Sequence, residues 1–463
     1  MRIVLADIKT SEGYVAKDTV AGGYGSRLVP FTRVTSVYSW VKRSFRLLPS
    51  VQMAHLAAIA AQKGHDVVFA RDGVPDADVA LVLSSLVDYR QETAWADVAR
   101  SRGIKVGFIG LAASQLPELF AEHADFIIRG EPESTMLRLV SGEQLQGVVS
   151  SPPIPDLDEL PFPRWDLIHD LNRHWFGLGR RFGGNRFPLL ASRGCPESCV
   201  YCPHRISAEY RVRSVKNIAE ELDLLCERYP NPRVIFRDAL FTEDRDRCME
   251  LCDEIRTRNL HFSFEFETRL DRLDDDLLAQ FYAAGLRAIS FGVESVRPDT
   301  LRRMGRRLIP EAKQRAIVEA CNQRGIETMA FYVFGFPQDD WASISATIEY
   351  SIALGSTFAQ YKLLTPYPGT PLWKGMEPLI IEEDWQRFDG FTHTFVHPNL
   401  TAKETRFLLG AAYSRFYMRP SFLSNFLQIQ NERVRGWVQL LDEKSRRKHD
   451  KLEYSIISRT VGC

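Results

Sequence analysis

The 463-residue chain has no long apolar run, no excess of either charge and few cysteines. No stretch approaches the roughly 18 apolar residues that a membrane-spanning helix needs. The start, MRIVLADIKTSEG, lacks the apolar core of a signal peptide. Lysine plus arginine and aspartate plus glutamate number 59 each, so bulk charge does not favour a nucleic acid partner. We therefore expect neither membrane nor nucleic acid as a partner, while a single phosphate or nucleotide substrate stays open.

The eight cysteines are few for this length and are irregularly spaced, which argues against a secreted disulfide framework. The expected location is the reducing cytoplasm.

Short apolar runs alternate with helical patterns over residues 1–150, which predicts a domain with a parallel, Rossmann-like sheet. The expected strands are Ile3–Ala6, Asp66–Ala70, Val79–Leu83, Lys105–Ile109 and Asp125–Arg129, and the expected helices are Ser50–Lys63, Trp95–Arg102 and Leu116–Glu122. The connection from Lys9 to Pro49 has a length typical of lids and insertions. Its glycine-rich stretch, Ala21–Arg27, suits either a phosphate cradle or a flexible loop.

A proline-rich linker at 151–184 precedes a second alternating block at 185–384. The strands expected there are Leu189–Ser192, Arg233–Arg237, Ser263–Thr268, Ala288–Gly292, Thr328–Phe334 and Ala359–Leu364. Six strand–helix units predict a partial (β/α)6 barrel with its chemistry at the carboxyl ends of the strands. Residues 385–463 are expected to form a mainly helical accessory domain that closes the barrel with its aromatic side chains. These are Trp385, Phe388, Phe391, Phe395, Tyr413, Phe416 and Tyr417.

Three cysteines lie within eight residues on a predicted loop, at Cys195, Cys199 and Cys202. Thiolates are the usual ligands of iron–sulfur clusters, and three of them bind three corners of a cubane and leave one iron open. The alternative is a zinc loop, in which His204 completes a closed tetrahedral site.

The cysteine spacing, with Tyr201 as the aromatic before the last cysteine, resembles the CxxxCxxC signature of the radical S-adenosylmethionine (SAM) superfamily. Five further segments resemble motifs of that family in the expected order: Asp238 with Phe241-Thr242, Glu267-Thr268-Arg269, Ser290–Ser295, Phe334–Pro337 and Pro366–Thr370. The resemblance implies a [4Fe–4S] cluster whose open iron chelates SAM. It also implies that an electron from the cluster breaks a carbon–sulfur bond and releases a 5′-deoxyadenosyl radical.

The resemblance also implies cofactor-binding roles for residues at the strand ends. Asp238, Glu267 and Glu294 carry carboxylates that suit an ammonium group or ribose hydroxyls, and Arg269 suits a carboxylate. Gly335 permits close approach of the backbone to an adenine. The barrel's candidate cofactor residues are Tyr201, Asp238, Glu267, Arg269, Ser290, Glu294, Gly335 and Pro337.

The segments Phe108–Leu111, Leu116–Glu118 and Ala124–Glu133 resemble the cobalamin-binding domain of B12-dependent radical enzymes. The resemblance implies polar contacts to the nucleotide tail from Ser84 and Ser85, and a place at the sheet edge for Gly110, Gly130 and Glu131. The family's DxHxxG motif, with its lower histidine ligand, is absent. Gly110-Leu111 replaces a glycine pair, and Ala112-Ala113 replaces Pro-His. The domain therefore either binds cobalamin or keeps the fold without it.

Five cysteines lie outside the loop, at Cys226, Cys248, Cys252, Cys321 and Cys463. Cys248 and Cys252 share one face of a predicted helix and suit an auxiliary cluster, with Cys463 as a further ligand. The favoured interpretation is that they are small buried residues, since none forms a CxxC pair.

The leading hypothesis is a cobalamin-dependent radical methyltransferase that acts on an unactivated carbon of a small molecule in specialised, antibiotic-type metabolism. Its electron donor is expected to be a flavodoxin or ferredoxin. The alternative is a cobalamin-independent radical enzyme that inserts sulfur, rearranges a ring or epimerises a nucleoside or sugar. A third interpretation, a light- or redox-sensing module, does not use the cysteine loop. Fold analogy alone does not identify the substrate.

Iron content tests the interpretation of the spare cysteines. We expect about four irons per chain after anaerobic reconstitution, since the cysteine loop holds one cubane. A count near eight would establish an auxiliary cluster.

Overall fold

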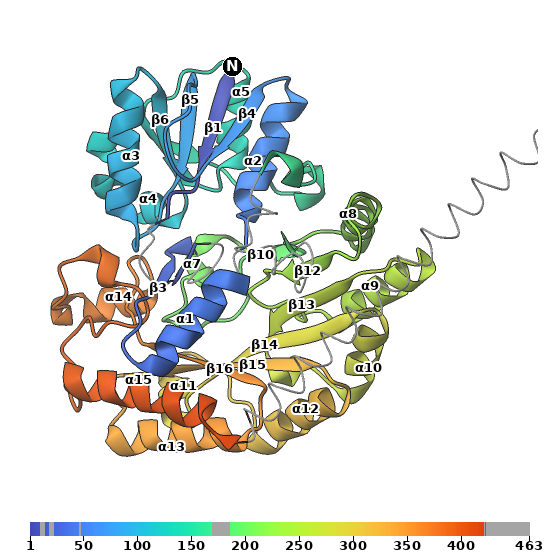
Figure 1. Ribbon diagram of the computed structural model, residues 1–463, viewed down its shortest axis with the longest axis vertical. Helices are drawn as coiled ribbons and strands as arrows, with labels where there is room; N and C mark the ends of the chain where they lie inside the picture. The colour runs from blue at the N-terminus through green and yellow to red at the C-terminus, as the bar shows by residue number, and fades with distance from the viewer. Residues whose placement is uncertain (10–13, 18–22, 46–47, 169–185, 421, 423–463) are drawn as a thin grey trace, which may run out of the picture.

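The computed structural model describes residues 1–9, 14–17, 23–45, 48–168, 186–420 and 422. The chain forms two six-stranded sheets, and the strands of each sheet run parallel to one another. One sheet lies above the other, and each has helices packed against it (Figure 1). The strand orders are β4-β1-β5-β6-β7-β8 and β16-β15-β14-β13-β12-β9. This α/β architecture confirms the predicted pair of a Rossmann-like sheet and a partial barrel. No helix among these residues is long and apolar enough to cross a membrane.

The first sheet consists of β1 (Arg2–Ala6), β4 (Asp66–Ala70), β5 (Val79–Leu83), β6 (Lys105–Ile109), β7 (Phe126–Gly130) and β8 (Gly147–Ser151). Its helices are α2 (Val51–Gln62), α3 (Tyr89–Ser101), α4 (Leu111–Gln115) and α5 (Glu133–Val140). All of its strand pairs are parallel. The central strand β5 is buried throughout because α2 and α5 cover one face of the sheet and α3 the other.

Two details of the first domain differ from the prediction. Residues 116–122 do not form one helix, since Pro117 has no backbone N–H, and the chain instead makes 3₁₀ turns at Pro117–Leu119 and Ala121–His123. The sixth strand, β8, was not predicted, because this edge strand is mostly exposed and lacks an apolar pattern.

The barrel strands are β9 (Arg186–Leu189), β12 (Arg233–Phe236), β13 (Ser263–Thr268), β14 (Leu286–Glu294), β15 (Glu327–Phe334) and β16 (Phe358–Leu363). The helices are α8 (Val215–Arg228), α9 (Arg245–Thr257), α10 (Asp275–Ala283), α11 (Pro298–Arg303), α12 (Glu311–Gln323) and α13 (Trp341–Ala353). The six strands lie side by side in the order in which they occur along the chain, as in a partial barrel. The first strand was predicted at 189–192, which is wrong, because the actual strand begins with the charged but buried Arg186.

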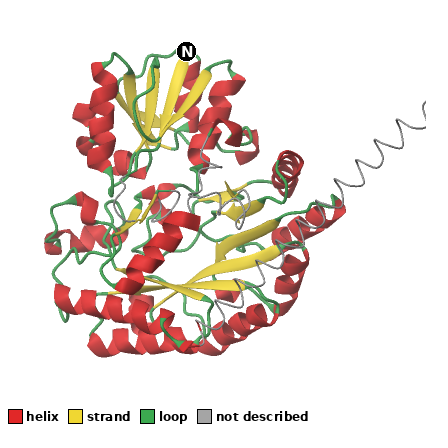
Figure 2. Cartoon of the chain, in the orientation of Figure 1, coloured by secondary structure: helices red, strands yellow, loops and turns green. Residues whose placement is uncertain are grey.

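The cysteine loop lies between β9 and β12. It is bordered by the short antiparallel pair β10 (Ser192–Arg193) and β11 (Arg211–Val212), and it includes α7 (His204–Ser207). Figure 2 shows this region in the gap between the two large sheets. The loop therefore faces the first domain.

The open edge of the barrel sheet is covered by the C-terminal helix α15 (Ala402–Tyr417) rather than by another strand. The hydroxyl of Tyr413 accepts a hydrogen bond from the N–H of Tyr361 at 3.3 Å and donates one to its carbonyl at 3.0 Å. The hydroxyl of Tyr417 likewise accepts a hydrogen bond from the N–H of Ala359 at 3.2 Å and donates one to its carbonyl at 2.5 Å. These two tyrosines thus provide hydrogen-bond partners for the backbone groups of Ala359 and Tyr361 at the outer edge of β16.

The barrel mouth is covered from above by the long connection that follows β1, which contains β2 (Tyr14–Ala16), β3 (Ser26–Leu28) and α1 (Arg33–Phe45). We call residues 14–17 and 23–45 the lid; they lie between the two sheets (Figure 1). The C-terminal aromatics Tyr413 and Tyr417 close the open edge of the barrel sheet, and Phe391 lines the cavity beneath the lid, but the lid covers the mouth. Predicted segments 169–184 and 423–463, with Cys463, lie outside the described residues.

Buried polar contacts tie the lid to both domains. The Tyr24 hydroxyl donates to the carbonyl of Pro368 at 2.6 Å, and the Lys17 ammonium pairs with Glu92 at 2.7 Å. A β-carbon at Gly25 would lie 2.8 Å from Val87 Cγ2, so this part of the glycine-rich stretch is packed against the protein. Ala21 and Gly22 lie outside the described residues.

Replacing Tyr413 with phenylalanine tests the edge contact. We expect Tyr413→Phe to lower the free energy of unfolding by about 2 kcal/mol, because both backbone groups of Tyr361 lose a buried partner. Chemical denaturation measures the change. Tyr282→Phe, at a 40% exposed tyrosine, is the control and should leave stability unchanged; equal effects of the two substitutions would contradict the edge role.

Candidate active site

Three adjoining cavities meet at His204, which lines all of them. The cluster cavity (about 140 Å³) contains the cysteines, and the interdomain cavity (about 250 Å³) separates the first sheet from the cysteine loop. The barrel cavity (about 290 Å³) lies inside the barrel under the lid. Glu267 and Ser290 line both the cluster cavity and the barrel cavity, while Arg237 lines both the barrel and interdomain cavities.

Cys195, Cys199 and Cys202 all line the cluster cavity. The backbone holds their loop, since Val200 N–H donates to Met304 O at 3.0 Å and Leu372 N–H donates to Val200 O at 3.0 Å. Three thiols in one cavity fit the ligand set of a cubane with an open iron. Among the described residues, no three His, Cys, Asp or Glu side chains lie close enough together to hold a single metal ion.

Glu294 closes one side of the cluster cavity in a strained conformation. Its φ is +66°, in the left-handed region that residues with a β-carbon rarely adopt. The side chain is buried, and burial raises its pKa, although Arg306 lies 3.4 Å away. A β-carbon at Gly292 would collide with this carboxylate, so the glycine makes room for it.

Arg269 and Glu267 approach the same cavity from the end of β13. The Arg269 guanidinium bonds Asp271 at 2.9 Å and the carbonyl of Arg307 at 3.0 Å, while its buried Nη1 has no hydrogen-bond partner and lies 3.7 Å from Glu197 Oε2. A fixed guanidinium with a spare donor suits a carboxylate ligand. Glu267 pairs with Arg237 at 2.5 Å.

Four of the eight cofactor residues predicted in the barrel line none of the three cavities: Tyr201, Asp238, Gly335 and Pro337. Asp238 is buried and accepts from Ala191 N–H at 3.1 Å and from the Ser192 hydroxyl at 2.5 Å, so it holds the start of the cysteine loop.

The Tyr201 ring packs edge-on against Phe336, 5.7 Å away, in the turn that contains Gly335. The N–H groups of Gly335 and Phe336 both donate to Asp339 at 3.0 Å. Burial raises the pKa of Asp339 to about 6.

The predicted residues of the first domain divide into two groups. Ser84 and Ser85 are fully buried: the Ser84 hydroxyl donates to Ile109 O at 2.7 Å, and the Ser85 hydroxyl donates to Glu92 at 2.7 Å. Both serines therefore build the sheet edge and do not line the interdomain cavity. Gly110, Gly130 and Glu131 do line it.

The interdomain cavity has a backbone-rich, apolar wall at the carboxyl ends of β5, β6 and β7. Leu83, Gly110, Leu111 and Gly130 contribute to this wall, and both glycines have φ near +104°. Such a surface fits the close approach of a broad ring, as expected at this edge of a Rossmann-like sheet. The described residues of this wall include no histidine; His204 lines the cavity from the barrel side.

Ion pairs across the two domains fix the opposite wall. Arg193, two residues before Cys195, pairs with Glu131 at 2.5 Å and with Glu133 at 2.7 Å, and Arg211 also pairs with Glu131. Burial alone would raise the pKa of Glu133, but the Arg193 guanidinium holds it below its usual value. We call Arg193, Arg211, Glu131 and Glu133 the interdomain clamp.

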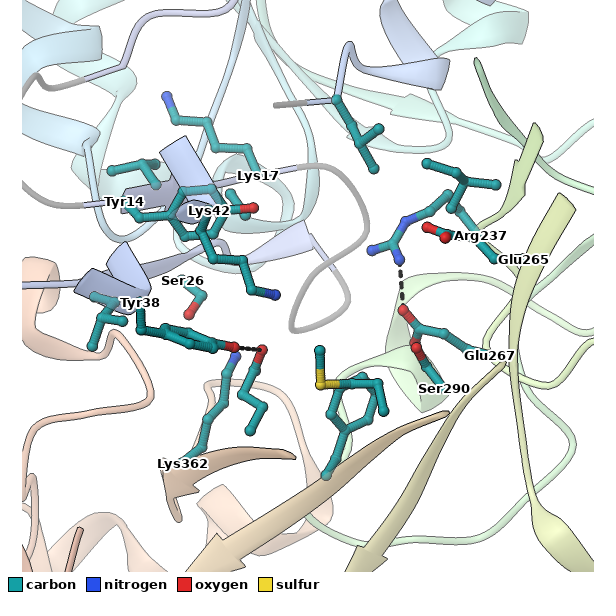
Figure 3. A pocket seen from close by; sticks show the side chains of 18 of the residues that line it. Tyr14, Lys17, Ser26, Tyr38, Lys42, Arg237, Glu265, Glu267, Ser290 and Lys362 are labelled. Carbon is teal, nitrogen blue, oxygen red and sulfur yellow. Dashed lines mark hydrogen bonds and ion pairs between the residues drawn. The ribbon is translucent and has the colours of Figure 1, made fainter. Parts of the chain in front are cut away.

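The barrel cavity combines barrel strands with lid residues (Figure 3). Glu267, Ser290 and Arg237 lie on one side, while Lys362 and the lid residues Tyr38 and Lys42 lie on the other. The position between lid and cysteine loop makes this the candidate substrate cavity.

Several site residues were not predicted from the sequence. The sequence predicted His204 only as a zinc ligand, and it indicated no site role for Arg193, Glu133, Arg237 or Lys362. The position of Arg193 just before the cysteine motif was an available signal. The partner of Arg237, Glu267, and the surroundings of Lys362 come from elements distant in the chain, which no local pattern reveals.

The spare cysteines on the barrel helices lie in the apolar core. Cys248, Cys252 and Cys321 are buried there, and the Cys248 thiol lies 3.8 Å from the carbonyl of Phe241. Their surroundings favour a packing role.

Comparisons with known proteins agree with the site. The sequence profile of the Radical SAM superfamily matches residues 189–350. An uncharacterized methyltransferase of Pyrococcus horikoshii is 28% identical, over 65% of this chain and 68% of that protein. The bacteriochlorophyllide d C-12(1)-methyltransferase of Chlorobaculum tepidum is 23% identical, over 82% of each chain.

A solved structure shares the fold. OxsB, a cobalamin-dependent S-adenosylmethionine radical enzyme with aqua-cobalamin and S-adenosylmethionine bound, matches with a TM-score of 0.66 at 13% identity. The match covers 95% of this chain and 72% of that chain. At this identity the likeness establishes the arrangement of the two sheets.

Removing the central arginine of the interdomain clamp tests its role. We expect Arg193→Met to lower the free energy of unfolding by about 3 kcal/mol or more, because the buried Glu133 loses its partner and Glu131 keeps only Arg211. It should also lower the iron retained after reconstitution, since the cysteine loop loses its support.

Calorimetry and iron quantitation measure these two effects. The control is Arg138→Met, which removes an exposed ion pair with Glu143 and should change neither quantity. Wild-type stability and iron content in Arg193→Met would show that the clamp is dispensable.

Proposed function

Because this chain belongs to the radical SAM superfamily, we propose that it is a cobalamin-dependent radical methyltransferase that acts on an unactivated carbon of a small molecule. The observation that carries the proposal is the meeting of the cluster, interdomain and barrel cavities at His204. The adjoining positions of the cavities support a reaction in which the radical source, the methyl source and the substrate each occupy one of them. Relatives whose names include methyltransferase activity support the reaction type.

The bound groups supply the difficult chemistry: the cluster and SAM provide a carbon-centred radical, and cobalamin provides the methyl group. The protein orients them. Arg269 is placed to hold the carboxylate of SAM, and Glu294 its ammonium group. Gly110 and Gly130 leave space for a ring at the sheet edge.

The lid covers the barrel cavity and limits the access of water, which would protect a reactive intermediate from side reactions. Its buried contacts, Tyr24 to Pro368 and Lys17 to Glu92, hold it closed over the barrel. We propose that a flavodoxin or ferredoxin delivers the electron and that the substrate belongs to specialised metabolism.

A cobalamin-independent radical reaction is the second candidate. Two observations favour it. The hydroxyls of Ser84 and Ser85 already donate hydrogen bonds within the first domain, and Leu111 replaces the second glycine of the family pair. In this case the first domain would serve only to position the cysteine loop and the lid.

Turnover with methyl-labelled SAM separates the two candidates. With reductant, cobalamin and a small-molecule extract of the native host, we expect labelled product together with S-adenosylhomocysteine and 5′-deoxyadenosine. Mass spectrometry detects all three. Formation of 5′-deoxyadenosine without the other two would contradict methyl transfer and support the second candidate.

Cysteine variants test the radical source separately. Cys199→Ser should abolish 5′-deoxyadenosine formation, because the cubane loses one of its three ligands. Cys226→Ser, on α8 and outside the cluster cavity, should retain it. Cleavage of SAM by Cys199→Ser at the wild-type rate would exclude the assigned cluster site.

A further inference from the structure

The barrel cavity has an excess of cationic side chains. Its lining includes the cations Lys9, Lys17, Lys42, Arg186, Arg237 and Lys362, but only two carboxylates, Glu265 and Glu267. Several of these charges are matched inside the protein: Lys9 pairs with Asp7, Lys17 with Glu92 and Arg237 with Glu267. Glu265 pairs with Arg233. The lining carboxylates are thus already engaged.

Lys362 differs from these cations. Side chains along β16 alternate, so that Gln360 and Lys362 face the cavity while Tyr361 and Leu363 are buried on the opposite side. Among the described residues, no hydrogen bond or ion pair engages the Lys362 ammonium group. Burial lowers its pKa to about 8, although the charges of Asp389, Glu267 and Glu294 act in the opposite direction. A partly desolvated cation of this kind lacks a counter-ion.

The surroundings of Lys362 form a small polar pocket. Figure 3 shows its ammonium group and the Lys42 side chain directed toward the same space, with the Tyr38 hydroxyl beside them. The Tyr38 hydroxyl lies 3.5 Å from Gln360 Oε1. The aromatic ring of Phe391 lies 6.0 Å from the Lys362 nitrogen. Cationic and hydroxyl donors thus converge from strand β16 and helix α1.

We propose that Lys362 anchors an anionic group, a carboxylate or a phosphate, of the substrate in the barrel cavity. The inference rests on the proposed function, since it takes the barrel cavity as the substrate site, and it adds the chemical class of the substrate. An anion here would complete the missing charge pair and accept hydrogen bonds from Lys362 and its neighbours.

The size and position of the cavity limit the rest of the substrate. A volume of about 290 Å³ lies at the low end of the ~300–1,000 Å³ typical of ligand pockets, which suits a small polar molecule. Glu267 and Ser290 also border the cluster cavity, on the other side from Lys362 in Figure 3. The anionic end therefore points toward β16, and the reacting carbon lies toward Ser290.

Binding measurements test this assignment without turnover. Titration calorimetry on the anaerobically reconstituted protein uses two probes, inorganic phosphate and succinate, which separate the two anion classes. We expect one probe to bind with a stoichiometry near one, and Lys362→Met to weaken it roughly tenfold or more. Lys362→Arg keeps the charge and should stay within roughly threefold of wild type.

Lys374→Met, at an exposed lysine of α14, is the matched control and should bind like the wild type. Unchanged binding in Lys362→Met, equal losses in Lys362→Met and Lys374→Met, or no binding of either probe to the wild type would overturn the assignment. Formation of 5′-deoxyadenosine, measured in parallel, should persist in the control Lys374→Met. If all variants and the wild type lack it while the anion still binds, the proposed function fails and the anion site stands.

Discussion

The buried ion pairs that join Arg193 to Glu131 and Glu133 set the relation between the two domains, and the rest of the site depends on them. Arg193 lies two residues before Cys195, while both glutamates follow β7 at the carboxyl edge of the first sheet. One guanidinium therefore fixes the distance between the sheet edge and the cysteine loop. Charges this deeply buried are costly to leave unpaired, so the contact favours a single arrangement of the domains.

The lid is held by the same kind of contact. Lys17 is fully buried and pairs with Glu92 and, at 3.5 Å, with Asp88, so a charge at the end of β2 ties the lid to the first domain. On the barrel side, Tyr24 hydrogen-bonds Pro368 and stacks on Tyr367, with ring centroids 5.2 Å apart. The lid thus covers the barrel cavity and contacts both domains.

Local patterns in the sequence predicted the two sheets and the strand ends that carry the motifs, because apolar periodicity and glycine position are local signals. β5 and β13, for example, have the predicted bounds. The roles of Ser84, Ser85 and Asp238 were less predictable, since burial and internal hydrogen bonds depend on neighbours distant in the chain. The interdomain clamp and Lys362 escaped prediction for the same reason, as their surroundings come from separate elements.

The proposed function requires that cobalamin binds at the carboxyl edge of the first sheet, where the interdomain cavity separates it from the cysteine loop. The most direct measurement is the absorption spectrum of protein purified anaerobically from cells supplied with cobalamin. The account predicts corrin bands in addition to those of the iron–sulfur cluster, near one corrinoid per chain. A spectrum of the cluster alone, in protein that still cleaves SAM, would contradict it.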